Sequence, residues 1–419
     1  MADTFTSVFL TVLAISIATR VWLAWRHVTH VAACRNQVPR EFADRIPLAA
    51  HQKAADYTIS KSRFGLLALT VETGLLLTLT LGGGLDTLAG FWRERLDGLW
   101  PAWYGLVLIF SVVALSSAVD LPLALWRQFV IEERFGFNRM TPALFFIDMA
   151  KSTLIGALIG TPVILAVLWL MGTMGALWWL YVWLFWCSFN LLILFVYPTW
   201  IAPLFNKFTP MEAGETKTRV EALLTRCGFR SGGLFVMDGS KRSAHGNAYF
   251  TGFGQNKRIV FFDTLLKRLQ PEEIEAVLAH ELGHFRRRHV AKRIVMMFAL
   301  SLGFLALLGQ LIEAPWFYAS LGVGNASQGT AMALILFFLV MPAFVFPLTP
   351  FGSLLSRRHE FEADRYAAEH ASSNDLVRAL VKLYEDNAAT LTPDPLHSLF
   401  YDSHPPAAIR IARLQAAPT

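Results

Sequence analysis

The chain has 419 residues, of which 54% are hydrophobic and only 16% are charged. A soluble globular protein carries more charge, so this composition indicates a membrane protein, and the thirteen tryptophans and thirty-three phenylalanines suit membrane interfaces. The net charge of +6 does not indicate nucleic-acid binding, because the basic residues follow the membrane topology predicted below. Cys34, Cys187 and Cys227 are far apart in the sequence, which excludes a disulfide framework and a cysteine zinc site and predicts free thiols.

Seven apolar stretches are each close to the ~20 residues that cross a bilayer. They are residues 6–25, 64–82, 102–126, 153–172, 177–197, 293–312 and 331–349. No basic residue precedes the first stretch and no small-residue cleavage site follows it, so we expect it to remain as a span. Glu72 and Asp120 lie inside spans, and the sequence leaves open whether they face a water-filled interior or a dry contact between helices.

Lysine and arginine residues are distributed unevenly between the two sides of the membrane on which the connections between seven spans would lie. Thirty-three of them lie in 26–63, 127–152, 198–292 and 350–419, against two in 83–101, with Arg20 and Arg293 inside spans. The positive-inside rule then places the N-terminus outside and the C-terminus in the cytoplasm. The alanine- and arginine-rich composition favours a bacterial inner membrane, whereas a eukaryotic source would place the chain in the endoplasmic reticulum membrane.

Residues 198–292 form the largest soluble segment. An amphipathic helix is predicted at 217–228 and a short strand at 234–237. Two further strands, 248–251 and 258–262, flank a turn at 252–256. We therefore expect a small sheet beside the helix that starts at Pro271, and we expect this helix to continue towards the sixth span.

That helix carries the sequence His-Glu-Leu-Gly-His at 280–284. Histidines four residues apart leave the same face of a helix, so His280 and His284 can occupy two corners of a zinc tetrahedron. Glu281 can reach a water molecule at the metal without binding the metal itself. The alternative is an ordinary helix in which the two histidines occur by chance. A metal site therefore needs a third ligand and supporting residues.

The residues after this motif exclude one class of zinc protease. In metzincins a glycine and a third histidine follow at fixed spacing, but here Arg287 and Val290 occupy these positions. His289 misses the required position by one residue, and we predict that it is a histidine on the helix surface.

A second candidate segment follows the seventh span. Glu360 and Asp364 are four residues apart, which is the layout of a gluzincin, with Glu360 as the third zinc ligand and Asp364 orienting a ligand histidine. The alternative is a solvated acidic helix face, since Glu362 and Glu369 are nearby. The upstream His-Glu-Leu-Gly-His motif favours the ligand interpretation.

The chain resembles the type 1 CAAX prenyl proteases, a family of integral-membrane zinc endopeptidases. The matching stretches are FGFN at 135–138, YPTWIAPLFNKFTP at 197–210, GNAYFTG at 246–252, KRIVFFDTLL at 257–266, HELGH at 280–284, SRRHEFEAD at 356–364 and SHPP at 403–406. They span most of the chain, and seven spans is the family's number. Heat-shock-type membrane proteases of the same clan have fewer spans than this chain.

The resemblance implies a role for each matching position. His280, His284 and Glu360 would bind one Zn²⁺ per chain, Glu281 would be the general base and Asp364 would support a ligand. His404 and Arg410 would face the substrate, with His404 as a donor to the developing oxyanion, although either could be an ordinary surface or helix-end residue. Asn247 and Ala248 would lie on an edge strand that pairs with an extended substrate.

These observations predict a multi-pass α-helical membrane protein with seven spans and a cytoplasmic α+β zincin-type protease domain. Its parts would be a five-span domain at 1–197, a first catalytic part at 198–292, spans six and seven at 293–349, and a second catalytic part at 350–419. The expected partners are the lipid bilayer and a peptide or protein substrate with or without a prenyl group. Two alternatives stay open: a membrane quality-control metalloprotease with no prenyl requirement, and a non-catalytic transporter or scaffold.

Overall fold

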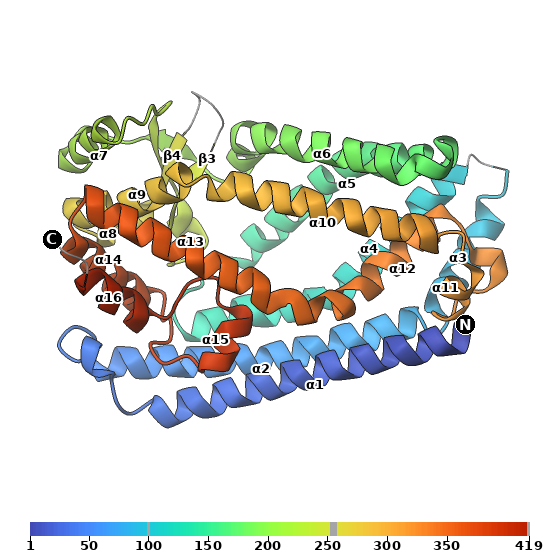
Figure 1. Ribbon diagram of the computed structural model, residues 1–419, viewed down its shortest axis with the longest axis horizontal. Helices are drawn as coiled ribbons and strands as arrows, with labels where there is room; N and C mark the ends of the chain where they lie inside the picture. Colours follow the sequence, from blue (N-terminus) through green and yellow to red (C-terminus); the bar gives the residue numbers. More distant parts are fainter. Residues whose placement is uncertain (99–100, 252–257, 417–419) are drawn as a thin grey trace.

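The computed structural model describes residues 1–98, 101–251 and 258–416. Within these ranges, seven helical segments are long and apolar enough to cross a membrane, which confirms the predicted number. They are Ala2–Cys34 (α1), Leu48–Leu79 (α2), Pro101–Glu132 (α4, Pro101–Trp126, and a π-helical turn), Pro142–Thr173 (α5), Gly175–Leu204 (with α6, Trp178–Val196), His289–Leu311 (α10) and Thr330–His370 (α12, Thr330–Val345, and α13, Thr349–His370). Helices α1, α2 and α10 run along the longest axis of the molecule (Figure 1).

The helices extend well beyond the predicted apolar stretches. At 1.5 Å per residue, the 33 residues of α1 span about 50 Å, against about 30 Å for the hydrocarbon core. The segment between the helices α1 and α2 is therefore shorter than the predicted connection 26–63 between spans, because α2 already starts at Leu48. Hydropathy marks the lipid-facing part of a helix and does not show where the helix itself ends.

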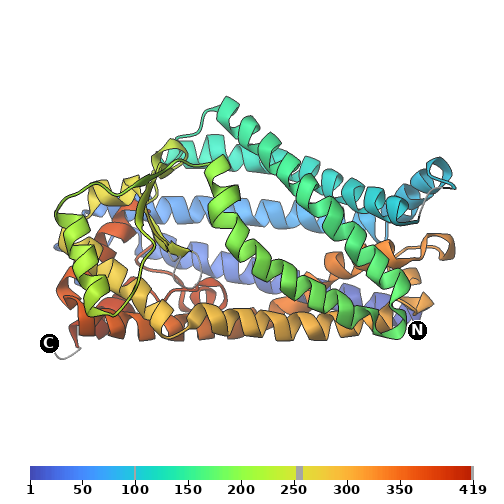
Figure 2. The same cartoon turned by 90° about the horizontal axis from the view of Figure 1, so that it is seen from above.

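The remaining helices gather at the two ends of the bundle. At the end with the N-terminus lie α3 (Gly84–Arg95) and α11 (Pro315–Ala319). At the other end lie α7 (Glu215–Arg226), α8 (Asp263–Arg268), α9 (Pro271–Arg286), α14 (Ser373–Asp386) and α16 (Ala407–Gln415), with α15 (Pro395–Tyr401) set back beside α1 (Figures 1 and 2). Helix α7 confirms the amphipathic helix predicted at 217–228.

A four-stranded sheet completes this end of the molecule. Its strands are β1 (Phe208–Pro210), β2 (Leu234–Met237), β3 (Ala248–Thr251) and β4 (Arg258–Phe262), in the order β1-β2-β4-β3. Strands β2 and β4 are parallel, and both outer strands are antiparallel to their neighbours. The three predicted strands are confirmed, β1 was not predicted, and the turn predicted at 252–256 lies outside the described residues.

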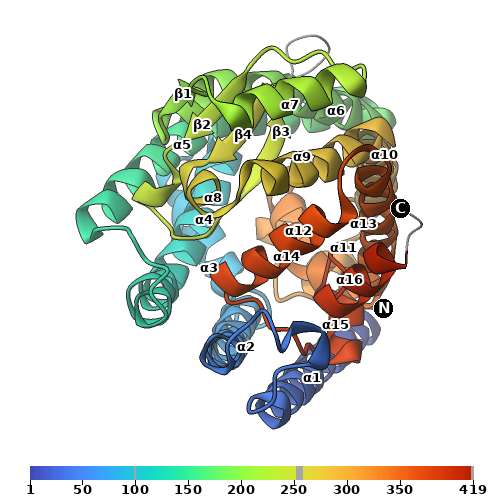
Figure 3. The same ribbon diagram turned by 90° about the vertical axis from the view of Figure 1, so that its left-hand side faces the viewer.

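The sheet and the surrounding helices share one hydrophobic core. Ile259 and Phe261 of β4 belong to the same buried cluster as Leu223 of α7, Leu278 of α9 and Ile411 of α16. Figure 3, which looks onto this end, shows α7 and α9 beside the sheet and α14 and α16 across from it. The catalytic candidates on α9 are thus held in a packed domain rather than on a mobile loop.

The two acidic residues inside spans, Glu72 and Asp120, are both exposed on the surface of the chain rather than buried between helices. Asp120 lines a cavity of about 810 Å³ whose other lining residues come from α4, α5, α6, α10 and α12. Asp120 and three serines are the polar residues in a lining that is otherwise apolar. All three cysteines are free, as predicted.

Candidate metal centre

Helices α9 and α13 bring the two candidate segments together. Helix α9 begins at Pro271, as predicted, behind a capping box formed by Gln270 and Glu273. It packs directly on α13, and a Cβ atom added to Gly283 would lie only 2.9 Å from Cα of Ala363. Gly283 therefore allows the two backbones to approach closely, which places Glu360 opposite the two histidines.

Three candidate ligand atoms converge at this contact. The Nε2 atoms of His280 and His284 are 3.2 Å apart, and they lie 3.5 and 3.3 Å from the carboxylate oxygens of Glu360. Bonds of about 2.0–2.1 Å from a tetrahedral zinc ion give ligand–ligand distances of about 3.3 Å. Oε2 of Glu360 is also buried and accepts no hydrogen bond from the described residues. These residues fit a zinc ion.

Asp364 and Arg410 lie behind His280. Nδ1 of His280 is 2.9 Å from Asp364 Oδ1, and the Arg410 guanidinium donates to both oxygens of Asp364 at 2.9 and 2.6 Å. Burial lowers the pKa of His280, but its hydrogen bond to Asp364 and the nearby carboxylate of Glu360 raise this pKa to about 9. The same negative charge that stabilises a proton on this imidazole would stabilise a divalent cation.

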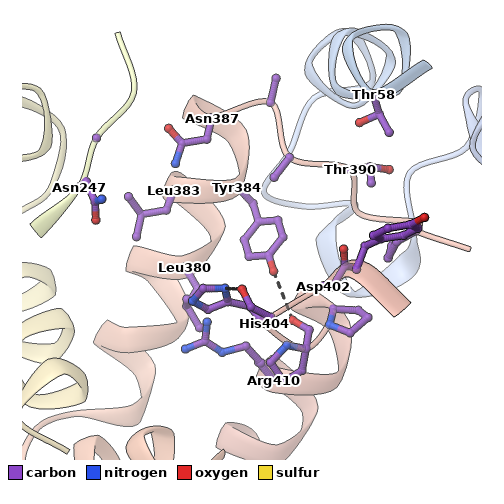
Figure 4. A pocket seen from close by; sticks show the side chains of 18 of the residues that line it. Thr58, Asn247, Leu380, Leu383, Tyr384, Asn387, Thr390, Asp402, His404 and Arg410 are labelled. Carbon is purple, nitrogen blue, oxygen red and sulfur yellow. Dashed lines mark hydrogen bonds between the residues drawn. The ribbon is translucent and has the colours of Figure 1, made fainter. Parts of the chain in front are cut away.

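The site opens into a cavity of about 620 Å³, here called the site cavity. Figure 4 shows Asn247 on one side, Leu380, Leu383 and Tyr384 of α14 along a wall, and Thr58 of α2 opposite. Glu281 lines this cavity together with Ala248, and burial raises the pKa of its carboxyl group. A carboxylate with a raised pKa beside a metal site is suited to accepting and returning a proton.

The structure places the tail residues at the same cavity. Nε2 of His404 lies 3.5 Å from Oε1 of Glu360, while Ser403 and His404 share a hydrogen bond of 3.0 Å. The hydroxyl of Tyr384 donates to the carbonyl of Pro405 at 3.4 Å, which holds this segment against α14 (Figure 4). Arg410 lines the cavity but is 5% exposed and bound to Asp364, so its predicted substrate contact remains a prediction.

Asn247 and Ala248 lie at the beginning of β3, which is an outer strand of the sheet. The main chain of Asn247 accepts a hydrogen bond from Phe262 of β4, and Ala248 pairs with Phe261. The opposite edge of β3 faces no other strand among the described residues. Both residues line the site cavity, which is the placement that β-sheet extension by a substrate requires.

Two features near the site were not predicted. His289 is 1% exposed and touches His284, so its predicted place on the helix surface is wrong. The helix of the motif also does not continue into the span, because α9 ends at Arg286 and α10 starts at His289. The break lies at Arg287 and Arg288, and the latter has a φ of 55°.

Comparison with known proteins shows the family to which the chain belongs. A family profile described as CAAX prenyl protease N-terminal, five membrane helices, matches residues 27–207, and the profile of peptidase family M48 matches 210–417. The CAAX prenyl protease 1 homolog of Arabidopsis thaliana is 36% identical over 385 residues, covering 89% of each chain. CAAX prenyl protease 1 of Saccharomyces cerevisiae is 38% identical, covering 72% of this chain and 70% of the relative.

A human relative and a solved structure agree with this result. The human CAAX prenyl protease 1 homolog is 32% identical, covering 91% of this chain and 89% of the relative. The crystal structure of Ste24p from S. mikatae superposes with a TM-score of 0.88 at 30% identity, covering 97% of this chain and 98% of that one. The chain therefore belongs to peptidase family M48, among the CAAX prenyl protease 1 homologues, and is a multi-pass membrane metalloprotease.

Proposed function

We propose that His280, His284 and Glu360 bind one zinc ion and that the protein uses it to hydrolyse peptide bonds. The observation that carries this proposal is the convergence of three ligand atoms within 4.8 Å of one another. Asp364 fixes the ring of His280 by accepting its Nδ1 hydrogen, and Arg410 fixes Asp364.

A zinc ion held there would polarise the scissile carbonyl and lower the pKa of a water molecule. Glu281 takes a proton from the attacking water on its carboxylate and delivers it to the leaving amine nitrogen. His404, whose Nε2 lies 3.5 Å from Oε1 of Glu360, donates a hydrogen bond to the developing oxyanion. The substrate extends the sheet at Asn247 and Ala248, so that its scissile bond lies over α9.

The substrate proposal follows from where the ligands are attached. Glu360 lies on α13, which continues the seventh span, and α10 begins three residues after the end of α9. Both ligand segments are thus tied to the membrane boundary, where a lipid-attached or membrane-inserted substrate is concentrated. A prenylated C-terminal peptide fits this placement, as the names of the relatives suggest. The distribution of basic residues supports a cytoplasmic site with an outside N-terminus, in a bacterial inner membrane or in the endoplasmic reticulum membrane.

The test compares a farnesylated C-terminal peptide with the same peptide lacking the lipid, in detergent at matched free concentration. Burial of a prenyl group contributes about 0.8 kcal/mol per CH₂ before ordering costs, so the farnesylated peptide should have the higher kcat/KM. Metal analysis of the purified protein should give one zinc per chain. Equal kcat/KM for the two peptides would favour the quality-control alternative, and an inactive, zinc-free protein would favour the scaffold.

A further inference from the structure

A second series of hydrogen-bonded polar side chains leads away from the metal centre, on the side opposite Asp364. Nδ1 of His289 lies 3.0 Å from Nδ1 of His284, and Nε2 of His289 lies 3.0 Å from Oε2 of Glu362. The ring of His359 stacks on His289 with centroids 3.9 Å apart and planes 10° apart. His289 is therefore enclosed between α9 and α13, with both ring nitrogens in hydrogen-bond contact.

The contact between His284 and His289 depends on the break between α9 and α10. In a continuous α-helix, residues five apart point about 140° away from each other, so the two rings could not meet. Here Arg288 adopts the left-handed conformation, with a φ of 55°, and α10 starts at His289. This conformation is disfavoured for a residue with a Cβ atom, and it turns His289 back towards His284.

The hydrogen-bond partners determine where the protons lie. Glu362 is a carboxylate and accepts, so Nε2 of His289 carries a hydrogen and its Nδ1 is left as an acceptor. Nδ1 of His284 must then donate to His289. This assigns the Nδ1–H tautomer to His284 and leaves the lone pair on its Nε2, the atom that faces His280 and Glu360.

We infer that His289, oriented by Glu362, is a positioning residue that fixes the tautomer and ring orientation of His284 for zinc binding. The ring of His284 is thereby fixed by a hydrogen bond to a second imidazole, whereas the ring of His280 is fixed by a direct hydrogen bond to the carboxylate of Asp364. The inference rests on the proposed zinc ligation by His284. Loss of such a supporting hydrogen bond weakens metal binding by roughly 10- to 100-fold.

The test measures zinc affinity of the full-length protein in detergent by chelator competition, together with the absorption spectrum of the Co²⁺-substituted protein. His289→Phe keeps a ring against His359 but removes both hydrogen bonds, so it should weaken zinc binding roughly 10- to 100-fold and shift the Co²⁺ spectrum. His289→Asn loses the ring but places an amide oxygen where Nδ1 was, so it should remain closer to wild type. His359→Phe, the matched control, keeps the stack and should bind zinc as wild type does.

A purely structural role for His289 predicts the reverse order, because His289→Asn destroys the ring stack that His289→Phe preserves. That order, or equal zinc affinity of His289→Phe and His359→Phe, would overturn the inference. If His289→Phe does not fold, Glu362→Leu replaces it in the test, because Glu362 is the partly exposed partner of His289. Wild-type zinc affinity in Glu362→Leu would also overturn the inference. If the wild-type protein binds no zinc, the proposed ligand set itself is refuted. This result is distinguishable from a failure of the inference about His289, in which the wild-type protein binds zinc.

Discussion

Gly283→Ala tests whether the close contact between α9 and α13 sets the geometry of the metal centre. The new methyl group would lie 2.9 Å from Cα of Ala363 and 3.0 Å from Cβ of Tyr366. Carbon atoms in contact are normally about 3.5–4.0 Å apart, so the helices must separate by roughly 0.5–1 Å. The two histidines lie on α9 and Glu360 lies on α13, so the separation acts directly on the ligand distances.

Metal–ligand bonds tolerate deviations of only about 0.2 Å, and a misplacement of about 1 Å can reduce turnover by roughly 10²-fold. We therefore expect Gly283→Ala to bind zinc more weakly and to lose about two orders of magnitude in kcat/KM, with an overpacking cost of about 1–3 kcal/mol in stability.

The assay is peptide cleavage combined with zinc affinity and thermal unfolding, with Gly352→Ala as the matched control. Gly352 is on the same helix as Glu360, is exposed, and would place its methyl group in open space. That control should keep wild-type activity and unfold no more easily, since alanine is favoured over glycine within a helix. If Gly283→Ala matched Gly352→Ala in zinc affinity and turnover, the argument that this glycine sets the ligand geometry would be refuted.

Three further outcomes are expected. Glu281→Gln should keep its zinc, measured by metal analysis, while turnover falls by about 10²–10⁴-fold, and near-normal hydrolysis would place the base elsewhere. Glu360→Ala should lose zinc, and full zinc occupancy with full activity would refute its role as a ligand. In a variant without native cysteines, Asn325→Cys should react with an impermeant thiol reagent in intact cells and Gly214→Cys should not. The reason is that the distribution of basic residues places these two positions on opposite sides of the membrane. The opposite labelling pattern would reverse the proposed topology.

Features with a local origin were predictable from the sequence. The start of α9 at Pro271 follows from proline and acidic residues in a first helical turn, and the helical period alone places His280 and His284 on one face. Strands β2, β3 and β4 were found because each is a short apolar run between turn residues. Strand β1 was missed because it has three residues and ends in a proline, which resembles a loop.

The role of His289 could not be predicted, because it depends on one backbone conformation and on a distant helix. The sequence Arg-Arg-Arg at 286–288 contains no glycine or proline, so nothing in it signals that α9 stops there. The left-handed conformation of Arg288 depends on tertiary contacts, because the next residue, His289, is buried against α13. The same α13 carries Glu360 and Asp364 about one turn apart, with Glu362 between them. One helix thus supplies the third candidate ligand and the carboxylates behind both histidines, so displacing α13 should disturb all three contacts together, whereas a substitution at Glu362 should disturb only the contact to His289.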